Sequence, residues 1–307
     1  MKWLPAYLTL ALIWGCSFYF IKLGLESFTP AGVASGRLFF GAITLLVALA
    51  ITKSTFPPRR YLVPAFIYAA IVSAIPWLLF AWAETQVTSA LAGVINGVTP
   101  LATLVAILVA FPEEKPTRQR MLGLGIGFIG VLIVIGIGTA AIGGSALGML
   151  ACFGAISCYG FSYPFARRYL LGGEHAGRIS SLSLASSTMV FGLIVTIPFT
   201  LVFGITQAPL SNPHIQLSSV LGILALGCLG SGIAYVLNFR ILALTDATTT
   251  STVTYITPLV AVLAGALFLD EHITWNQPVG GVLVVLGAAI AQGVLTLGKR
   301  GLDGTRS

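Results

Sequence analysis

The feature that most constrains the fold is a segment that occurs twice. Seven residues in a window of 25 are identical between the two copies, whereas chance in so apolar a chain gives about two. A weaker similarity relates Trp14–Lys22 to Tyr159–Arg167, at an offset of 145 residues. The chain is therefore a duplicated unit. The seven identities, 158 residues apart, are Thr99-Pro100-Leu101, Ala106, Glu113, Gln119 and Gly123 against Thr257-Pro258-Leu259, Ala264, Glu271, Gln277 and Gly281.

Composition places this duplicated unit in a membrane. Charged residues make up 8% of the chain and hydrophobic residues 57%, whereas a soluble protein carries roughly 25% charged residues. The apolar stretches exceed the roughly 18 residues that mark a bilayer-spanning helix. The sequence predicts an all-α integral membrane protein with ten transmembrane helices, over residues 3–24, 31–52, 61–83, 88–111, 119–138, 145–168, 179–204, 216–240, 247–269 and 276–298.

The basic residues indicate the orientation in the membrane. The net charge of +7 does not point to nucleic acid, because the basic residues are dispersed between apolar segments. With both termini in the cytoplasm, all of the sixteen Lys and Arg residues except Lys22 and Arg37 fall on the inner side, as the positive-inside rule requires. The inner residues are Lys2, Lys53, Arg59, Arg60, Lys115, Arg118, Arg120, Arg167, Arg168, Arg178, Arg240, Lys299, Arg300 and Arg306.

The spacing of the copies predicts an internal inversion. Five spans separate the start of one copy from the start of the next, and an odd number inverts the second copy. We expect two inverted five-helix repeats, residues 1–138 and 145–298, around a central cavity, and a cytoplasmic tail, residues 299–307. The N-terminal apolar run resembles a signal peptide, but the positive-inside count needs it as a retained first helix.

Two prolines mark equivalent breaks in the two copies. A proline inside a helix frees the carbonyl four residues earlier, here that of Asn96 for Pro100 and that of Thr254 for Pro258. Freed backbone at membrane depth is tolerated where it is packed in protein or lines a water-filled cavity. A structural bend is the alternative, but paired breaks favour a substrate site at the midplane, with Pro100 and Pro258 as hinges.

Polar and aromatic side chains share helical faces near these breaks. Ser and Thr in a membrane helix often bond to their own backbone, but asparagine is costlier in lipid and favours protein or water. Together the faces predict a cavity of aromatic rings and neutral hydrogen-bonding groups. The expected substrate-binding residues are Trp14, Ser17, Trp77, Asn96, Thr99, Tyr159, Ser162, Tyr235, Asn238, Thr254, Tyr255 and Thr257.

Charges inside the spans are few. Lys22 and Arg37 lie within about two turns of the outer helix ends, so we expect both side chains to reach the membrane interface. Pairing with Glu26 or Glu84 is an alternative for both, and Arg37 could instead attract a substrate carboxylate. Acidic residues lie near helix ends rather than at the midplane, so no carboxylate proton relay is expected.

Catalytic and cofactor signatures are missing from the sequence. There is no phosphate-binding loop, no His-Glu-x-x-His and no nucleophile with a base in reach. The four cysteines lie within spans without Cys-x-x-Cys spacing, and we interpret them as small hydrophobes rather than disulfides or metal ligands. Gly123 and Gly127 form a Gly-x-x-x-Gly face that favours tight helix packing. We therefore expect a protein that is not an enzyme, with no catalytic residue, cofactor or metal.

At these residues the chain resembles the EamA-type ten-helix permeases of the drug/metabolite transporter superfamily. The resemblance implies cytoplasmic termini in the bacterial inner membrane, a central cavity and export of small metabolites. The chain is also similar to bacterial exporters of aromatic and other amino acids. One departure is Pro112 before Glu113, against Asp270 before Glu271. The residues that carry the resemblance are Trp14-Gly15, Ser17, Pro30, Arg37, Thr99-Pro100, Glu113, Gly123, Thr257-Pro258, Glu271 and Gly281.

The hypothesis is a secondary transporter that exports amino acids, aromatic and other neutral ones, by alternating access. A multidrug, nucleoside or other metabolite permease of the same superfamily is the alternative. Nucleotide sugars would need several basic residues in the cavity, and cationic drugs a carboxylate there. A membrane-embedded enzyme would need clustered acidic, His or Cys residues, and a receptor a sizeable exposed domain. The expected partners are a small-molecule substrate and the lipid bilayer, without nucleic acid, and the arrangement is compatible with a monomer.

Overall fold

The computed structural model describes residues 3–87, 89–111, 117–135, 145–207, 215–257, 259–260, 275–291 and 295. These residues form helices and connecting loops, and β pairing among them is limited to an isolated bridge between Phe28 and Thr206.

The helices before residue 136 form three long apolar segments and two shorter ones. The first segment bends at Cys16, and the third contains a short π-helical stretch, η2. The elements are α1 Leu4–Gly15, α2 Ser17–Leu25, α3 Pro30–Ile51, η1 Arg59–Tyr61, α4 Leu62–Ala69, η2 Ala70–Ala74, α5 Ile75–Ala83, α6 Ser89–Asn96, α7 Thr99–Ala110 and α8 Arg118–Ile135.

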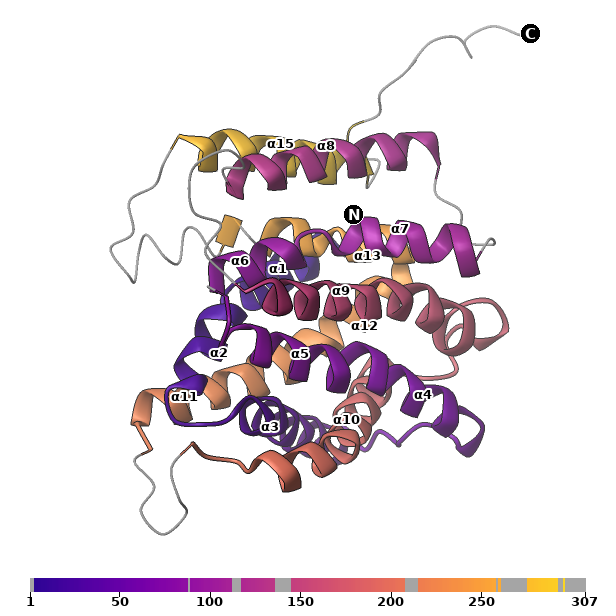
Figure 1. Cartoon of the computed structure of the whole chain (residues 1–307). Coiled ribbons are helices and arrows are strands. Elements are labelled where there is room, and N and C mark those ends of the chain that lie inside the picture. Colours follow the sequence, from indigo (N-terminus) through magenta and orange to yellow (C-terminus); the bar gives the residue numbers. More distant parts are fainter. Residues whose placement is uncertain are drawn as a thin grey trace, which may run out of the picture.

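The helices after residue 144 repeat this pattern of long segments with π-helical stretches. Residues 253–257 are also helical. The elements are α9 Ala146–Ala166, η4 Arg167–Leu171, η5 Gly173–His175, α10 Ser181–Phe203, α11 Leu217–Ala225, η6 Leu226–Ile233, α12 Ala234–Leu244, α13 Ala247–Ser251 and α15 Asn276–Ala291. In Figure 1, α5, α7, α8, α9 and α15 run roughly parallel across the view, and α3 and α10 are seen more nearly along their axes.

Six of the described helices are long and apolar enough to cross a bilayer. The expected spans 88–111, 119–138, 247–269 and 276–298 correspond to shorter described helices, and all four include residues outside the described ranges. An all-helical membrane protein is therefore confirmed. The six helices are Leu4–Leu25, Pro30–Ile51, Arg59–Ala83, Ala146–Leu171, Ser181–Phe203 and Leu217–Leu244.

Helix starts are fixed by local hydrogen bonds. Thr29 Oγ1 accepts from the backbone N–H of Gly32 at 2.9 Å, and Pro30 occupies the first helical position of α3. Ser145 and Ser180 accept in the same way at the starts of α9 and α10. Each bond satisfies a donor that the first helical turn leaves without a partner.

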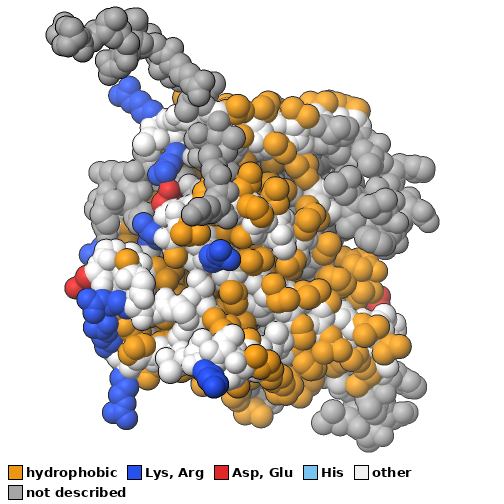
Figure 2. Space-filling model, turned by 180° about the vertical axis from the view of Figure 1, so that it is seen from behind, with side chains coloured by type: hydrophobic (Ala, Val, Ile, Leu, Met, Phe, Trp, Pro, Cys, Tyr) orange, Lys and Arg blue, Asp and Glu red, His pale blue; other side chains and the backbone are white. Residues whose placement is uncertain are grey.

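The surface separates apolar and basic regions. Large apolar side chains such as Leu201, Val109 and Ile51 are more than three-quarters exposed, which suits lipid rather than water. Figure 2 shows Lys and Arg gathered toward one edge and a wide apolar surface beside them. This separation is the one that a multi-pass membrane protein requires.

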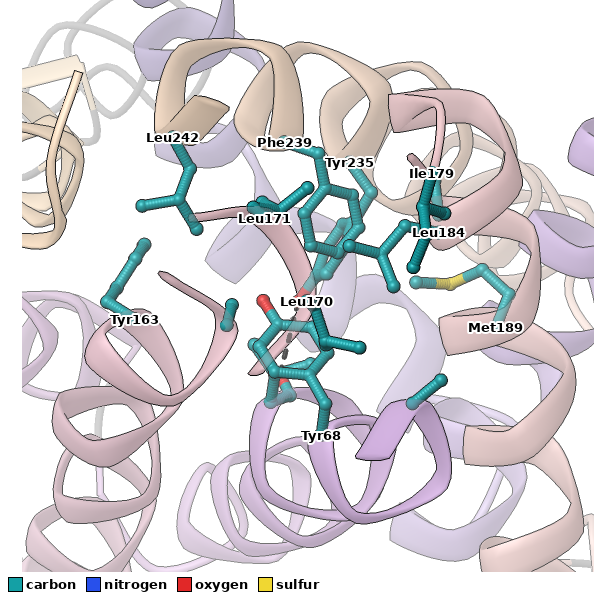
Figure 3. Packing of buried hydrophobic residues seen from close by; sticks show 14 of the residues in the cluster. Tyr68, Tyr163, Leu170, Leu171, Ile179, Leu184, Met189, Tyr235, Phe239 and Leu242 are labelled. Carbon is teal, nitrogen blue, oxygen red and sulfur yellow. Dashed lines mark hydrogen bonds between the residues drawn. The ribbon is translucent and has the colours of Figure 1, made fainter. Parts of the chain in front are cut away.

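The largest buried cluster among the described residues joins five of the six long segments. Tyr68 of α4, Leu170 of η4, Leu184 of α10 and Phe239 of α12 are fully buried in it (Figure 3). The Tyr68 and Phe239 rings are 5.6 Å apart, and the Phe239 and Tyr235 rings are 5.9 Å apart. This packing holds α12, and with it Tyr235, against the middle of the molecule.

Glycines permit one pair of helices to touch along their backbones. In Figure 1, α8 and α15 lie side by side. A Cβ on Gly287 would collide with the backbone nitrogen of Gly127, and one on Gly123 would collide with that of Ala291. A Cβ on Gly127 itself would lie 2.5 Å from Tyr255 Cε2. The Gly-x-x-x-Gly face at Gly123 and Gly127 therefore packs against helix, as expected.

Candidate functional site

A cavity lies in the middle of the helices. Its walls come from α1, α2, α3, η2, α5, α6, α9 and α12, and from Thr254. It leaves about 60 Å³ for the centres of water molecules, and one water needs roughly 10–15 Å³ on that measure. The cavity is therefore narrow, with room for about four to six waters. Its lining is Trp14, Ser17, Phe18, Ile21, Val33, Ala34, Arg37, Val72, Trp77, Phe80, Ala81, Asn96, Tyr159, Tyr163, Tyr235, Asn238 and Thr254.

Eight of the twelve expected substrate-binding residues line this cavity. They come from helices on both sides of residue 140, so the two copies of the duplicated unit both contribute. Asn238 is 1% exposed, and its Oδ1 has no hydrogen-bond partner among the described residues. The eight are Trp14, Ser17, Trp77, Asn96, Tyr159, Tyr235, Asn238 and Thr254.

The other four expected residues lie behind the lining, and their hydroxyls bond to backbone. Ser162 Oγ donates to the Tyr159 carbonyl at 2.8 Å. Tyr255 is fully buried against α8 and donates to the Leu124 carbonyl at 2.8 Å. Thr99 and Thr257 are the remaining two, and both bond to carbonyls in the helix breaks.

The structure supplies a partner for each carbonyl that the two prolines free. Thr99 Oγ1 donates to the Asn96 carbonyl at 2.6 Å, and Thr257 Oγ1 donates to the Thr254 carbonyl at 2.8 Å. Around Pro100 the helix is interrupted, with α6 ending at Asn96 and α7 beginning at Thr99. Pro258 lies outside the described residues. The threonine before each proline thus satisfies the backbone that its neighbour disrupts.

Two π-helical stretches place further backbone carbonyls at the cavity. The Val72 carbonyl in η2 accepts from Tyr235 Oη at 3.1 Å, and the Gly230 carbonyl in η6 accepts from Trp14 Nε1 at 3.1 Å. Gly230 follows Val72 by 158 residues, the offset between the copies, and Tyr235 follows Trp77 by the same number. Such stretches often mark functional positions in helices. No sequence pattern that we used predicts them.

Aromatic rings form much of the wall. The Tyr235 ring makes edge contacts with both tryptophans, at 5.9 Å from Trp14 and 5.7 Å from Trp77. Phe80 stacks on Tyr159 at 6.0 Å. Tyr163 lines the cavity one turn after Tyr159, and this spacing was a usable sequence signal that we did not apply.

The prediction that Arg37 reaches the membrane interface is wrong. Arg37 is 6% exposed and lines the cavity, because Pro30 starts α3 two turns earlier and the helix directs this side chain inward. Its Nε–H donates to Ser231 Oγ at 2.8 Å, and an Nη2–H donates to the Gly230 carbonyl at 3.3 Å. Its Cζ lies 3.8 Å from the centre of the Trp77 ring. The expected uncharged cavity therefore contains one cation.

Lys22, by contrast, is exposed, as expected. Glu84 lies near a helix end, as expected, but is buried. Glu84 directly follows the span Arg59–Ala83 and is 1% exposed. Ser89 Oγ donates to its Oε2 at 2.7 Å, but its Oε1 has no partner among the described residues. Burial raises the pKa of Glu84 to about 8, while Ser89 and Lys22 oppose this.

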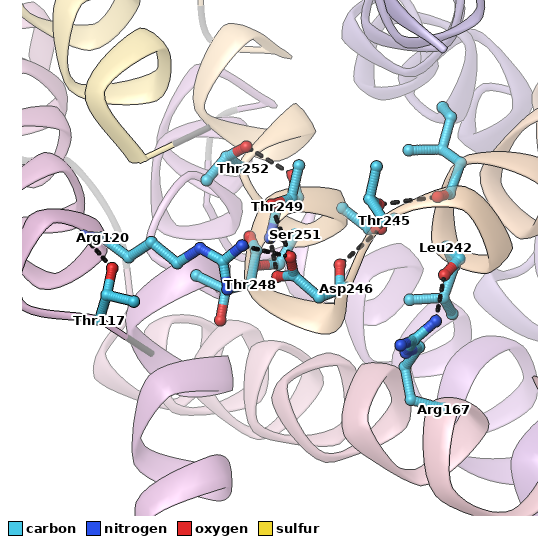
Figure 4. A network of polar contacts seen from close by, with 12 residues as sticks. Thr117, Arg120, Arg167, Leu242, Thr245, Asp246, Thr248, Thr249, Ser251 and Thr252 are labelled. Atoms are coloured by element: carbon cyan, nitrogen blue, oxygen red, sulfur yellow. Dashed lines mark hydrogen bonds and ion pairs between the residues drawn. The ribbon is translucent and has the colours of Figure 1, made fainter. Parts of the chain in front are cut away.

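A polar network lies away from the cavity, at the start of α13 (Figure 4). Arg120 Nη2 of α8 contacts Asp246 Oδ2 at 2.7 Å. Asp246 also accepts from the Thr249 backbone N–H at 2.9 Å and so caps α13. Arg167 donates to the Leu242 carbonyl nearby at 3.2 Å. Within the described ranges, no three His, Cys, Asp or Glu side chains gather as metal ligands.

Comparisons with known proteins agree with this architecture. A family model described as the EamA-like transporter family matches residues 1–136 and again residues 146–292. An "Uncharacterized transporter" of Archaeoglobus fulgidus is 25% identical over 289 residues, which cover 94% of this chain and 98% of the relative. The "Uncharacterized inner membrane transporter YedA" of Escherichia coli strain K12 is 28% identical over 300 residues, 96% of this chain and 90% of the relative.

A solved structure shares the fold. It matches with a TM-score of 0.73 and 15% identity, over 95% of this chain and 97% of its own. At that identity the likeness concerns the fold alone.

Proposed function

The chain belongs to the EamA-like transporter family, and on that premise we propose that it exports amino acids, aromatic and other neutral ones, by alternating access. The observation that carries the proposal is the central cavity, which both copies of the duplicated unit line with aromatic rings and amides. Rings accept apolar side chains and ammonium groups, and amides and hydroxyls bond to the polar ends of an amino acid.

The arrangement of the chain supports a two-halved mechanism. The family model matches twice, and the 158-residue offset relates two carbonyls at the cavity, those of Val72 and Gly230. We propose two inverted repeats, residues 1–138 and 145–298, with both termini in the cytoplasm of a bacterium. In this mechanism the two repeats rock against each other around the cavity and expose it to one side of the membrane and then to the other.

Loaded proteoliposomes test the proposal. Vesicles that contain the purified protein and labelled phenylalanine, threonine or methionine should release at least one of these amino acids faster than protein-free vesicles. The matched control is a variant with Gly130→Leu, whose side chain would collide with the backbone of Val284 in α15 and lies outside the cavity lining. Release of none of the three above the protein-free rate would remove the proposal.

A further inference from the structure

Arg37 is a buried cation for which the described part of the chain supplies no counter-ion. No carboxylate oxygen of a described residue lies within 4.0 Å of its guanidinium, and its two hydrogen bonds go to neutral oxygens. A guanidinium has five N–H donors, so three remain without a partner among the described residues. Arginine does not lose its proton in proteins, and a buried unpaired charge is strongly unfavourable.

The contacts around Arg37 hold it in place without neutralising it. Ser231 and the Gly230 carbonyl fix one edge of the planar group, and the Trp77 ring covers one face at 3.8 Å. The other edge of the guanidinium has no partner among the described residues, and the Arg37 side chain lines the cavity. An oriented, partly unsatisfied guanidinium matches the two oxygens of a carboxylate, which accept from it side by side.

The rest of the lining narrows the class of anion. Arg37 is the one Lys or Arg among the lining residues that the structure describes, which suits a single negative charge rather than a phosphate ester. Phe18, Phe80 and Tyr159 offer apolar surface for the body of the ligand. Asn238 Oδ1, buried without a described partner in the same lining, offers an acceptor for an ammonium group.

We propose that Arg37 binds the carboxylate of the transported molecule, so that the cavity selects monocarboxylates with an apolar or aromatic body. Amino acids are the members of this class that also carry an ammonium group, and that group donates a hydrogen bond to Asn238 Oδ1. The inference rests on the proposed function in one respect, namely that the cavity is the transport site.

Four ligands that share one ring test the assignment on the wild-type protein. Phenylalanine carries both charges, 3-phenylpropionate lacks the ammonium, and phenethylamine and phenylalanine methyl ester lack the free carboxylate. We expect the two carboxylates to raise the midpoint of thermal unfolding with affinities about tenfold or more above those of the amine and the ester. Equal affinity for the ester and the free acid would overturn the assignment, as would absence of any shift with the carboxylates.

Variants link the discrimination to Arg37. Arg37→Gln should lose the preference for carboxylates, and Arg37→Lys should keep part of it, because the charge stays while the paired N–H geometry is lost. Arg240→Gln removes an exposed arginine by the same change and should leave the preference intact. If Arg37→Gln does not fold, the four ligands on the wild-type protein decide.

The two proposals fail in different ways. If 3-phenylpropionate binds through Arg37 but no amino acid is released from proteoliposomes, the amino acid assignment falls and the carboxylate site stands. The opposite result is that amino acids are released, but either Arg37→Gln binds phenylalanine as tightly as the wild type does, or the wild type binds the methyl ester as tightly as phenylalanine. In that case the transporter proposal stands and the carboxylate site falls.

Discussion

Two arginines of this chain illustrate two ways of placing a cation at or near a membrane. Arg120 lies at the start of α8, one-third exposed, and pairs with Asp246 at 2.7 Å. Arg37 lies in the cavity wall and is 6% exposed. It donates hydrogen bonds to a serine hydroxyl and a backbone carbonyl and lies over an aromatic ring. The protein supplies a carboxylate where water already weakens the charge, and none among the described residues where the charge is most costly. This difference is the basis of the proposal that Arg37 binds the carboxylate of a transported molecule.

The largest effect is expected when Arg37 is given a carboxylate from within the protein. Ser231→Asp places one where Ser231 Oγ now accepts from Arg37 Nε. We expect carboxylate ligands to bind about 10- to 100-fold more weakly, because an internal pair occupies the guanidinium. Ligand-dependent thermal unfolding measures the affinity.

Ser231→Asn is the matched control, since it adds the same volume without the charge. The fully buried position makes both variants crowded, and only their difference reports on charge. Equal affinities of the Asp and Asn variants for phenylalanine would contradict the carboxylate site.

Removing the ring beside Arg37 should have a smaller effect. Trp77→Leu deletes the surface that the guanidinium covers at 3.8 Å, and a desolvated cation–π contact contributes about 0.5–2 kcal/mol. We expect the affinity for phenylalanine to fall about 2- to 30-fold. Trp82→Leu, in the same helix with the ring 41% exposed, is the control and should change little. If both substitutions weaken binding equally, the ring does not support Arg37.

Glu84 extends the comparison to a buried group that carries the opposite charge when it ionises. It is a buried carboxyl that can release its charge by taking a proton, which an arginine cannot do. Its pKa of about 8 in the folded protein exceeds the ordinary value of 4.5. Between these pH values the folded state binds more protons than the unfolded state, so stability falls as the pH rises from 5 to 8.

Glu84→Gln should remove this dependence. We expect the unfolding temperature of the wild type to fall by a few degrees from pH 5 to pH 8 relative to the variant, measured in the same detergent. The charged and titratable groups that act on Glu84 are Lys22 and Cys152, and both stay in the variant. Parallel curves for the two proteins would show that Glu84 does not titrate in this range.

Much of the fold was predictable from the sequence, because the length of an apolar stretch indicates whether a helix is long enough to cross a bilayer. The helix break before Pro100 was predictable as well, since proline removes a backbone donor. The position of Arg37 was not, because sequence depth alone does not tell whether a side chain faces lipid or the interior. The π-helical stretches were equally hidden, as they depend on how η2 and η6 pack around Tyr235 and Trp14. Thr99 and Thr257 were expected in the cavity, but each hydroxyl bonds to the carbonyl that the adjacent proline frees, which is the backbone alternative that the sequence left open.

The smallest expected effect concerns the paired arginine. Asp246→Ala removes both the ion pair with Arg120 and the cap on Thr249, whereas Asp246→Asn keeps a capping side chain and removes only the charge. We expect the Ala variant to lose about 1 kcal/mol of stability and the Asn variant less, because partly exposed ion pairs contribute about 0–1 kcal/mol. Thermal unfolding at low and high salt separates the two terms, since only the ion pair is screened. A loss from Asp246→Asn as large as that from Asp246→Ala would show that the ion pair, and not the cap, supplies this stability.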